Sequence, residues 1–333
     1  MVVDYQSHWY PEAYLETILD RDAFPRTRRG EDGGYVWQSN ASDIEWPIPR
    51  HFVDLEVSMA QAEADGIDVV VCSPNMVGDV TWYDVGEARE TIELVNGEIA
   101  RAQREYAGRF VGLAMLPLQD TTAALEALEH AIGELELKGV CAIANIRGGP
   151  IATPDTLPVY ERIEELGVPL FLHPGHRSMS WDLLQRFGMT MEVGLSWMFD
   201  TSAAALSLVY SGTLDACPTL QVVHPHAGGV LPYLKNRILG IPAFHKDLQP
   251  VKLERPVEQY FTDQFWVDSV APTPGSLEVA RELYGADRVV FASDFPWLPR
   301  TVVMEHLRDN VEEGFVRQIY DNQVAGLALP AAA

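Results

Sequence analysis

Eight short apolar segments alternate with helical segments along the chain, and this alternation limits the fold more than any other feature. The apolar segments span residues 2–8, 67–72, 110–116, 139–144, 169–173, 220–224, 265–268 and 288–293. Between them, apolar residues recur at helical spacing, as over residues 85–106, 121–137 and 276–284. Repeated strand–helix units of this kind predict parallel strands in an α/β fold.

Eight such units predict a closed (β/α)8 barrel, the TIM-barrel fold, rather than an open, doubly wound sheet. An open sheet normally has fewer strands and a glycine-rich turn after the first strand, where this chain has Trp9-Tyr10-Pro11. We expect one domain, residues 1–333. Two long stretches, about residues 20–49 and 174–199, are expected to be lid loops inserted after strands one and five.

Composition and charge exclude several kinds of partner. The net charge of -24 argues against nucleic acid and anionic membranes, because phosphate contacts need clustered Lys and Arg. The sequence has neither an apolar run of about 20 residues nor a basic segment leading into an apolar one at its start. We therefore expect a cytoplasmic protein with a small-molecule substrate.

Polar side chains stand where several of the predicted strands end. In a barrel of this type the carboxyl ends of the strands surround the active site. The residues at these positions are Gln6 and His8, His173, His226 and Asp294. Two imidazoles and a carboxylate form an open site for Zn²⁺ or a similar divalent ion, with room for water and substrate.

The same residues lie in motifs that resemble those of the amidohydrolase-related decarboxylases, the group around aminocarboxymuconate-semialdehyde decarboxylase. The D-x-H-x-H segment that begins their barrel is matched by Asp4-Tyr5-Gln6-Ser7-His8. Their H-P is matched by His173-Pro174, and their H-x-G-G-x-x-P by the segment from His226 to Pro232. Their G-S-D-x-P is matched by Ala292-Ser293-Asp294-Phe295-Pro296. The resemblance covers nearly the whole chain outside the two insertions.

The resemblance implies that His8, His173 and Asp294 bind a metal, with Zn²⁺ expected first. The sequence departs from the family at Gln6, where the family usually has His. A neutral amide oxygen is a poorer Zn²⁺ ligand than imidazole, so three possibilities remain open. Gln6 is a weak ligand or a neighbour of the ligands, the site binds its metal loosely or prefers Mn²⁺, or the site is free of metal.

For function, the resemblance implies non-oxidative decarboxylation of an aromatic or unsaturated carboxylic acid. His226 would be an acid/base close to metal-bound water, and Asp294 is the other catalytic candidate. The first alternative is a hydrolase of a lactone, amide or related bond that uses the same ligands. The second is a catalytically silent ligand-binding barrel. The resemblance also implies a homodimer.

Five further residues are candidates for contact with the substrate. His176 and Arg177 lie just past His173, Arg50 lies at the edge of the first insertion, and Trp297 closely follows Asp294. His224 shares a strand face with His226, so it either lines the site or is a satisfied histidine of the inner barrel.

Overall fold

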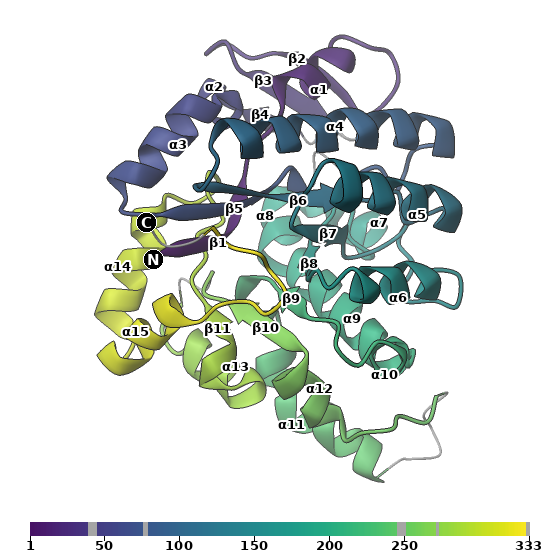
Figure 1. The fold of residues 1–333 in the computed structure, drawn as a ribbon, viewed down its shortest axis with the longest axis vertical. Coiled ribbons are helices and arrows are strands. Elements are labelled where there is room, and N and C mark those ends of the chain that lie inside the picture. The colour runs from purple at the N-terminus through teal and green to yellow at the C-terminus, as the bar shows by residue number, and fades with distance from the viewer. Residues whose placement is uncertain (39–44, 76–78, 245–250, 271–272, 331–333) are drawn as a thin grey trace.

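Eight parallel strands form the predicted barrel (Figure 1). The computed structural model describes residues 1–38, 45–75, 79–244, 251–270 and 273–330. The strands neighbour one another in the order β1-β5-β6-β7-β8-β9-β10-β11. They span Val3–His8, Val69–Ser73, Phe110–Met115, Gly139–Ile143, Leu170–His173, Val222–His224, Phe265–Asp268 and Val289–Val290.

The last strand, β11, has only two residues, and the barrel closes through the segment that follows it. The backbone N–H of Tyr5 in β1 donates to the carbonyl of Phe291 over 3.0 Å. The N–H of Asp294 donates to the carbonyl of Gln6 over 2.9 Å. The segment that carries Asp294 therefore lies against the carboxyl end of β1.

Side chains alternate between the barrel interior and the layer of helices, as the two-residue period of a strand requires. Val3, Tyr5, Val69 and Val71 belong to one buried cluster, whereas Val70 belongs to the cluster formed with the helices. Leu327 of the C-terminal segment packs into the interior cluster.

Helices cover the outside of the barrel, and several begin at an aspartate. The carboxylate of Asp84 accepts from the N–H of Glu87 over 2.9 Å, and so caps α4. Near the C-terminus, the side chain of Glu312 accepts from the N–H groups of Gly314 and Phe315 and so caps α15 (Glu313–Asp321). Apart from α1, α2, α7 and α8, which are given with the insertions below, the α-helices of the described residues are α3 Leu55–Ala64, α4 Val85–Glu105, α5 Thr121–Glu129, α6 Leu157–Glu165, α9 Trp197–Tyr210, α10 Thr213–Ala216, α11 Leu231–Phe244, α12 Val257–Asp263, α13 Ser276–Tyr284, α14 Arg300–Asn310 and α15 Glu313–Asp321.

The first insertion contains a second, three-stranded antiparallel sheet (top of Figure 1). Its strands are β2 Arg26–Arg29, β3 Tyr35–Gln38 and β4 Trp46–Ile48, flanked by α1 Glu12–Thr17 and α2 Arg50–Val53. Gly34 is needed before β3, because a Cβ there would lie 2.3 Å from the Ile48 carbonyl oxygen. Tyr35, Trp37 and Trp46 make up most of its buried face.

The second insertion is largely helical. It carries α7 Trp181–Leu184, α8 Met189–Met191 and a π-helical turn, Glu192–Ser196, that continues into α9. The role of either insertion as a lid remains a prediction.

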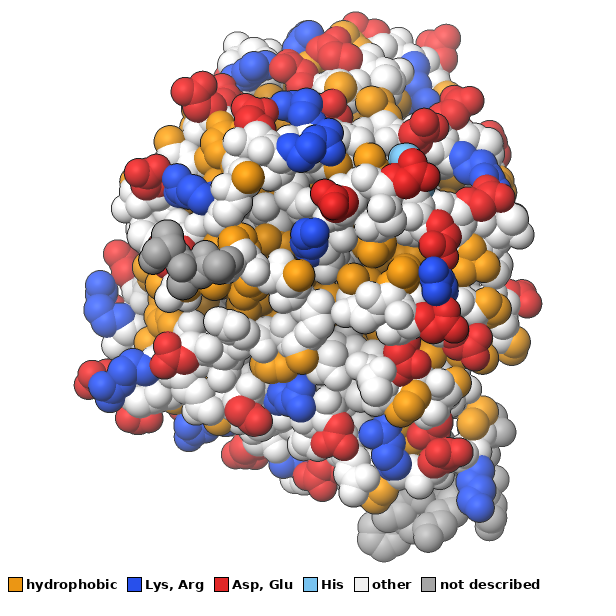
Figure 2. Space-filling view, viewed as in Figure 1, with side chains coloured by type: hydrophobic (Ala, Val, Ile, Leu, Met, Phe, Trp, Pro, Cys, Tyr) orange, Lys and Arg blue, Asp and Glu red, His pale blue; other side chains and the backbone are white. Residues whose placement is uncertain are grey.

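Acidic and basic side chains are interspersed on the face shown in Figure 2. That face shows no continuous basic patch, which agrees with the charge of -24. In the described part of the chain, no helix is both long and apolar enough to cross a membrane.

Candidate metal centre and adjoining cavity

His8, His173 and Asp294 come together at the carboxyl ends of β1, β8 and β11. One ligand atom from each lies within 4.8 Å of the others. Nε2 of His8 is 3.0 Å from Oδ1 of Asp294, and the rings of His8 and His173 meet edge to face at 4.8 Å between centroids. The structure thus brings together the three residues for which the resemblance implied metal binding.

Each of the two imidazoles is held by a backbone carbonyl. Nδ1 of His8 lies 3.2 Å from the oxygen of Ser73, and Nδ1 of His173 lies 2.8 Å from the oxygen of Pro174. A carbonyl oxygen only accepts, so Nδ1 carries a proton in both rings, and in a neutral His173 ring Nε2 is left with a free lone pair. Nε2 of His173 is buried and has no hydrogen-bond partner among the described residues. Burial lowers the pKa of His173, and the charge of His8 lowers it further, so its ring is neutral and able to bind a cation.

Gln6 completes the polar end of β1. Its Nε2 lies 3.3 Å from Oδ1 of Asp294, and its Oε1 is buried without a hydrogen-bond partner among the described residues. A buried acceptor with no donor is costly unless something else satisfies it. Together with Nε2 of His173, this oxygen suits a divalent cation, so the residues present fit a metal.

His226 stands beside the cluster on a tight turn after β9. Its φ of 55° and that of Ala227, 51°, lie in the left-handed region. Nε2 of His226 is 3.9 Å from Oδ2 of Asp294 and 3.5 Å from Nε2 of Gln6. Burial disfavours its charged form, yet the nearby carboxylate of Asp294 outweighs burial and raises the pKa of His226. His226 is therefore a group that can hold a proton next to the metal ligands.

The carboxyl group of Asp294 is ionised because the neighbouring histidines stabilise its negative charge. Burial opposes its ionisation, but the nearby imidazole of His226 and the hydrogen bond of His8 lower the pKa of Asp294 below its usual range. Its φ of 61° directs the carboxylate from a strained backbone position.

Asp268 is a functional candidate that the sequence reasoning missed. It is the last residue of β10, and its Oδ1 accepts from the N–H of Ala227 over 2.9 Å and from that of Val270 over 3.1 Å. It thereby holds the turn that carries His226, and its charge contributes to the raised pKa of His226. The sequence contained a signal for Asp268, because this residue ends the strand predicted over residues 265–268. Asp294 was selected for the same kind of position, directly after the strand predicted over residues 288–293.

A cavity of about 970 Å³ opens beside the cluster. His226 and Asp294 line one part of it, and three indole rings form much of the rest. Trp46 stacks on Trp197 with centroids 5.5 Å apart, and Trp297 meets Trp46 edge to face at 6.1 Å. The first insertion supplies Trp46, and Trp197 begins α9, so both insertions contribute to the wall.

Of the five predicted substrate contacts, the structure places Trp297 in the cavity wall. Nε1 of Trp297 donates to the Tyr10 hydroxyl over 2.6 Å, which fixes the ring. His176 and Arg177 are absent from the described lining. His176 instead lies 3.1 Å from the buried carboxylate of Asp79.

Arg177, Arg50 and His224 also have partners elsewhere. The guanidinium of Arg177 lies over the ring of Trp82, and that of Arg50 bonds Glu12 at 2.6 Å. Nδ1 of His224 lies 2.7 Å from the Tyr284 hydroxyl, in the layer between β9 and α13. Neither Arg50 nor His224 belongs to the described lining of the cavity.

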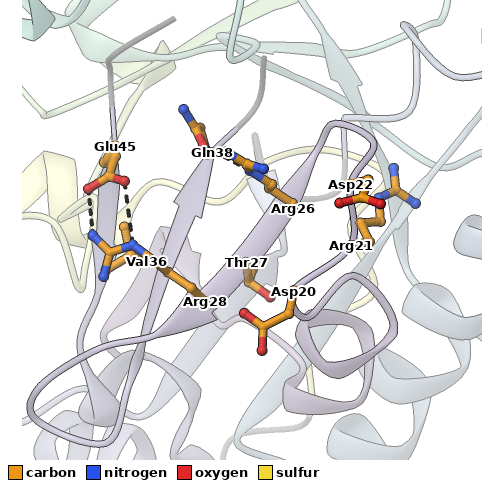
Figure 3. A pocket seen from close by; sticks show the side chains of 9 residues that line it. All are labelled: Asp20, Arg21, Asp22, Arg26, Thr27, Arg28, Val36, Gln38 and Glu45. Carbon is orange, nitrogen blue, oxygen red and sulfur yellow. Dashed lines mark hydrogen bonds and ion pairs between the residues drawn. The ribbon is translucent and has the colours of Figure 1, made fainter. Parts of the chain in front are cut away.

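A second hollow, of about 320 Å³, lies on the first insertion (Figure 3). Its lining shares no described residue with the metal cluster. Arg28 there pairs with Glu45, and Arg21 pairs with Glu87 of α4, each at 2.6 Å. These cations are engaged within the protein, so this hollow offers no free charge to a ligand from Arg21 or Arg28.

The profile of the amidohydrolase family matches residues 3–309 of this sequence. The chain belongs to the amidohydrolase family. The match confirms the resemblance. The matched residues include His8, His173 and Asp294.

Two curated amidohydrolase relatives are decarboxylases. The 2-amino-3-carboxymuconate-6-semialdehyde decarboxylase of Dictyostelium discoideum is 28% identical over 83% of this chain and 76% of its own length. The gamma-resorcylate decarboxylase of Polaromonas sp. is 27% identical over 84% of this chain and 91% of its own. Among solved structures, a Polaromonas dihydroxybenzoic acid decarboxylase with bound manganese and 2-nitroresorcinol has a TM-score of 0.77. It is 22% identical, with 96% of this chain and 94% of that chain covered, and it supports the barrel fold.

Proposed function

We propose that this protein is a metal-dependent, non-oxidative decarboxylase of an aromatic carboxylic acid. The observation that carries the proposal is the cluster of His8, His173 and Asp294, whose member Asp294 lines a cavity that also contains three tryptophans. The relatives named above, which act on aromatic or unsaturated acids by their names, support the reaction type.

The residues that would hold the metal are His8, His173 and Asp294, with Oε1 of Gln6 as a further oxygen donor. When bound, the ion would act as a Lewis acid toward the substrate carboxylate or an adjacent oxygen. Zn²⁺ is the ion proposed first and Mn²⁺ the alternative, which the manganese in the Polaromonas structure supports. Elemental analysis of the purified protein, followed by activity after chelation and reloading with each ion, distinguishes the two.

The rest of the reaction depends on the protein's own side chains. The indoles of Trp46, Trp197 and Trp297 offer aromatic faces to the substrate ring and exclude water. A proton is delivered to the ring carbon through Nε2 of His226, either directly or by way of Asp294, whose ionised carboxylate must first take up that proton. The bond between that carbon and the carboxylate then breaks, and carbon dioxide leaves.

The test is an assay of the metal-loaded protein with a panel of aromatic acids and lactones. We expect release of carbon dioxide and formation of the arene without incorporation of water. Ring opening of a lactone would instead indicate the hydrolase alternative. Absence of bound metal, together with no activity on adding one, would indicate the silent ligand-binding barrel.

Two further properties are proposed with the function. The homodimer implied by the resemblance is tested by light scattering of the purified protein. The cytoplasmic location is tested by fractionation of cells that express the full chain.

A further inference from the structure

The wall of the cavity beside the metal cluster is apolar over most of its extent. Besides the three tryptophans, its lining includes Val193, Pro232 and Val279. Among the described lining residues, the only His, Asp, Glu, Lys or Arg side chains are His226 and Asp294. The undescribed residues nearest in sequence to the lining, 271–272, are Ala and Pro.

The cavity is also large for a substrate with one ring. A cavity of about 150 Å³ suffices for benzene, and ligand pockets usually span about 300–1,000 Å³. The 970 Å³ here lies near the upper end of that range. A single-ring acid bound at His226 and Asp294 would leave much of the apolar wall in contact with water.

A second anionic group would find no cation along this wall. Gly275 and Ser276 in the lining lie at the start of α13, and Glu278 in the first turn of α13 offsets the dipole of that helix. Burying a charge without a partner is strongly unfavourable. The net charge of -24 further disfavours a dianion.

Building on the proposed decarboxylase function, we infer that the substrate class is an aromatic monocarboxylic acid with a fused or linked ring system. Its carboxylate would lie at the metal cluster and its uncharged rings along the wall from Trp46 and Trp197 to Val279. Aromatic dicarboxylic acids would be poor substrates.

Three hydroxy acids test this with the unaltered, metal-loaded enzyme: a hydroxynaphthoic acid, a hydroxybenzoic acid and a hydroxyisophthalic acid. We expect kcat/KM for the naphthoic acid to exceed that for the benzoic acid by at least about tenfold. The isophthalic acid, with its second carboxylate, should fall below the benzoic acid by at least about tenfold. The reverse order in either pair would overturn the inference.

A pair of matched variants tests the missing cation. Val279 and Val302 are both helix residues with similar exposure, 38% and 39%, but only Val279 lines the cavity. Val279→Arg should raise kcat/KM for the isophthalic acid relative to the benzoic acid by at least about tenfold, because it supplies a partner for the second carboxylate. Val302→Arg should leave that ratio unchanged. Equal ratios in a folded Val279→Arg and the unaltered enzyme would contradict the inference, and the comparison of the three acids stands without any variant.

Ligand binding separates this inference from the proposed function. Quenching of tryptophan fluorescence by the same acids reports affinity without turnover. Tighter binding of the naphthoic acid without any carbon dioxide would overturn the decarboxylase function and leave the ligand class supported. Turnover with a preference for the single-ring or dicarboxylic acid would overturn the ligand class and leave the function supported.

Discussion

Gln6 offers a neutral oxygen at a position where an imidazole would bind Zn²⁺ more strongly. Its Oε1 is buried without a described hydrogen-bond partner next to Asp294. We expect Gln6→His to tighten Zn²⁺ binding by about tenfold, equivalent to about 1.4 kcal/mol. Competition with a fluorescent chelator measures the change. An unchanged dissociation constant would place Gln6 outside the coordination of the metal.

His173 and His226 should respond differently to replacement by alanine. His173→Ala removes a neutral imidazole whose free Nε2 faces the cluster, so metal and activity should be lost together. His226→Ala should abolish activity and leave metal content near normal, because His226 lies beside the cluster and not within it. Metal analysis and the carbon dioxide assay on both variants check this. Loss of metal from His226→Ala would show that the two roles are assigned incorrectly.

Asp268 acts on the reaction through His226. Asp268→Asn keeps an oxygen for the N–H groups of Ala227 and Val270 but removes the charge that helps His226 to hold its proton. We expect kcat to fall by about 10–100-fold with metal content unchanged, as for other residues that orient a metal site. Asp268→Ala, which also removes both hydrogen bonds, serves as the more disruptive comparison. Unchanged kcat in Asp268→Asn would confine Asp268 to a structural role.

A buried ion pair joins the first strand of the barrel, β1, to helix α14 near the end of the chain. Arg300, at the start of α14, donates from Nε to Asp4 of β1 over 2.9 Å and from a terminal nitrogen to Ser7 over 3.0 Å. Asp4 also accepts from the N–H of Ser293 over 3.0 Å. Arg300→Ala would leave the Asp4 carboxylate buried without its cation, and the free energy of unfolding should fall by about 3–5 kcal/mol. Denaturant unfolding measures it.

An exposed pair provides the control. Arg109 and Glu63 lie 2.8 Å apart with side chains 36% and 72% exposed. Because water screens this pair, Arg109→Ala should change the free energy of unfolding by about 1 kcal/mol or less. Equal losses in the two variants would mean that the pair between Arg300 and Asp4 contributes no more than a surface contact.

The sequence predicted the strands and the clustering of His8, His173 and Asp294, whereas the roles of the candidate site residues stay predictions. Apolar strands and helical spacing are local patterns, so the eight strands were predictable. The cluster of His8, His173 and Asp294 was predictable because parallel strands end at the same rim. The three-stranded sheet β2-β3-β4 lies in a stretch expected to be a loop, because the pairing of β3 with residues 46–48 is not a local sequence pattern.

Side-chain direction in the loops was not predictable, because it depends on partners far away in the sequence. Arg50 bonds Glu12, and His176 pairs with Asp79, 97 residues earlier. The sequence alone does not reveal such pairs. Trp297 differs from these residues: it lies close after Asp294 in the sequence, and its side chain lines the cavity.

The net negative charge of the whole molecule should weaken the binding of an anionic substrate. A net charge of -24 repels an anionic substrate, and salt screens that repulsion. We expect KM for an aromatic acid to fall, by up to about tenfold, as ionic strength rises from about 0.01 M to 0.15 M. Steady-state kinetics measures the change, with binding of the uncharged amide of the same acid as the control. A KM that rises with salt would point instead to a local cation at the cavity.

Two of the three clustered residues, His8 and Asp294, lie far apart in the polypeptide. His8 lies in β1, whereas Asp294 follows β11, 286 residues later. During translation, a nascent chain that has not yet emerged beyond Asp294 holds only part of its donor set. A product that ends before Asp294 would lack one of the three clustered side chains, so we expect it to bind the proposed metal more weakly than a chain that holds all three.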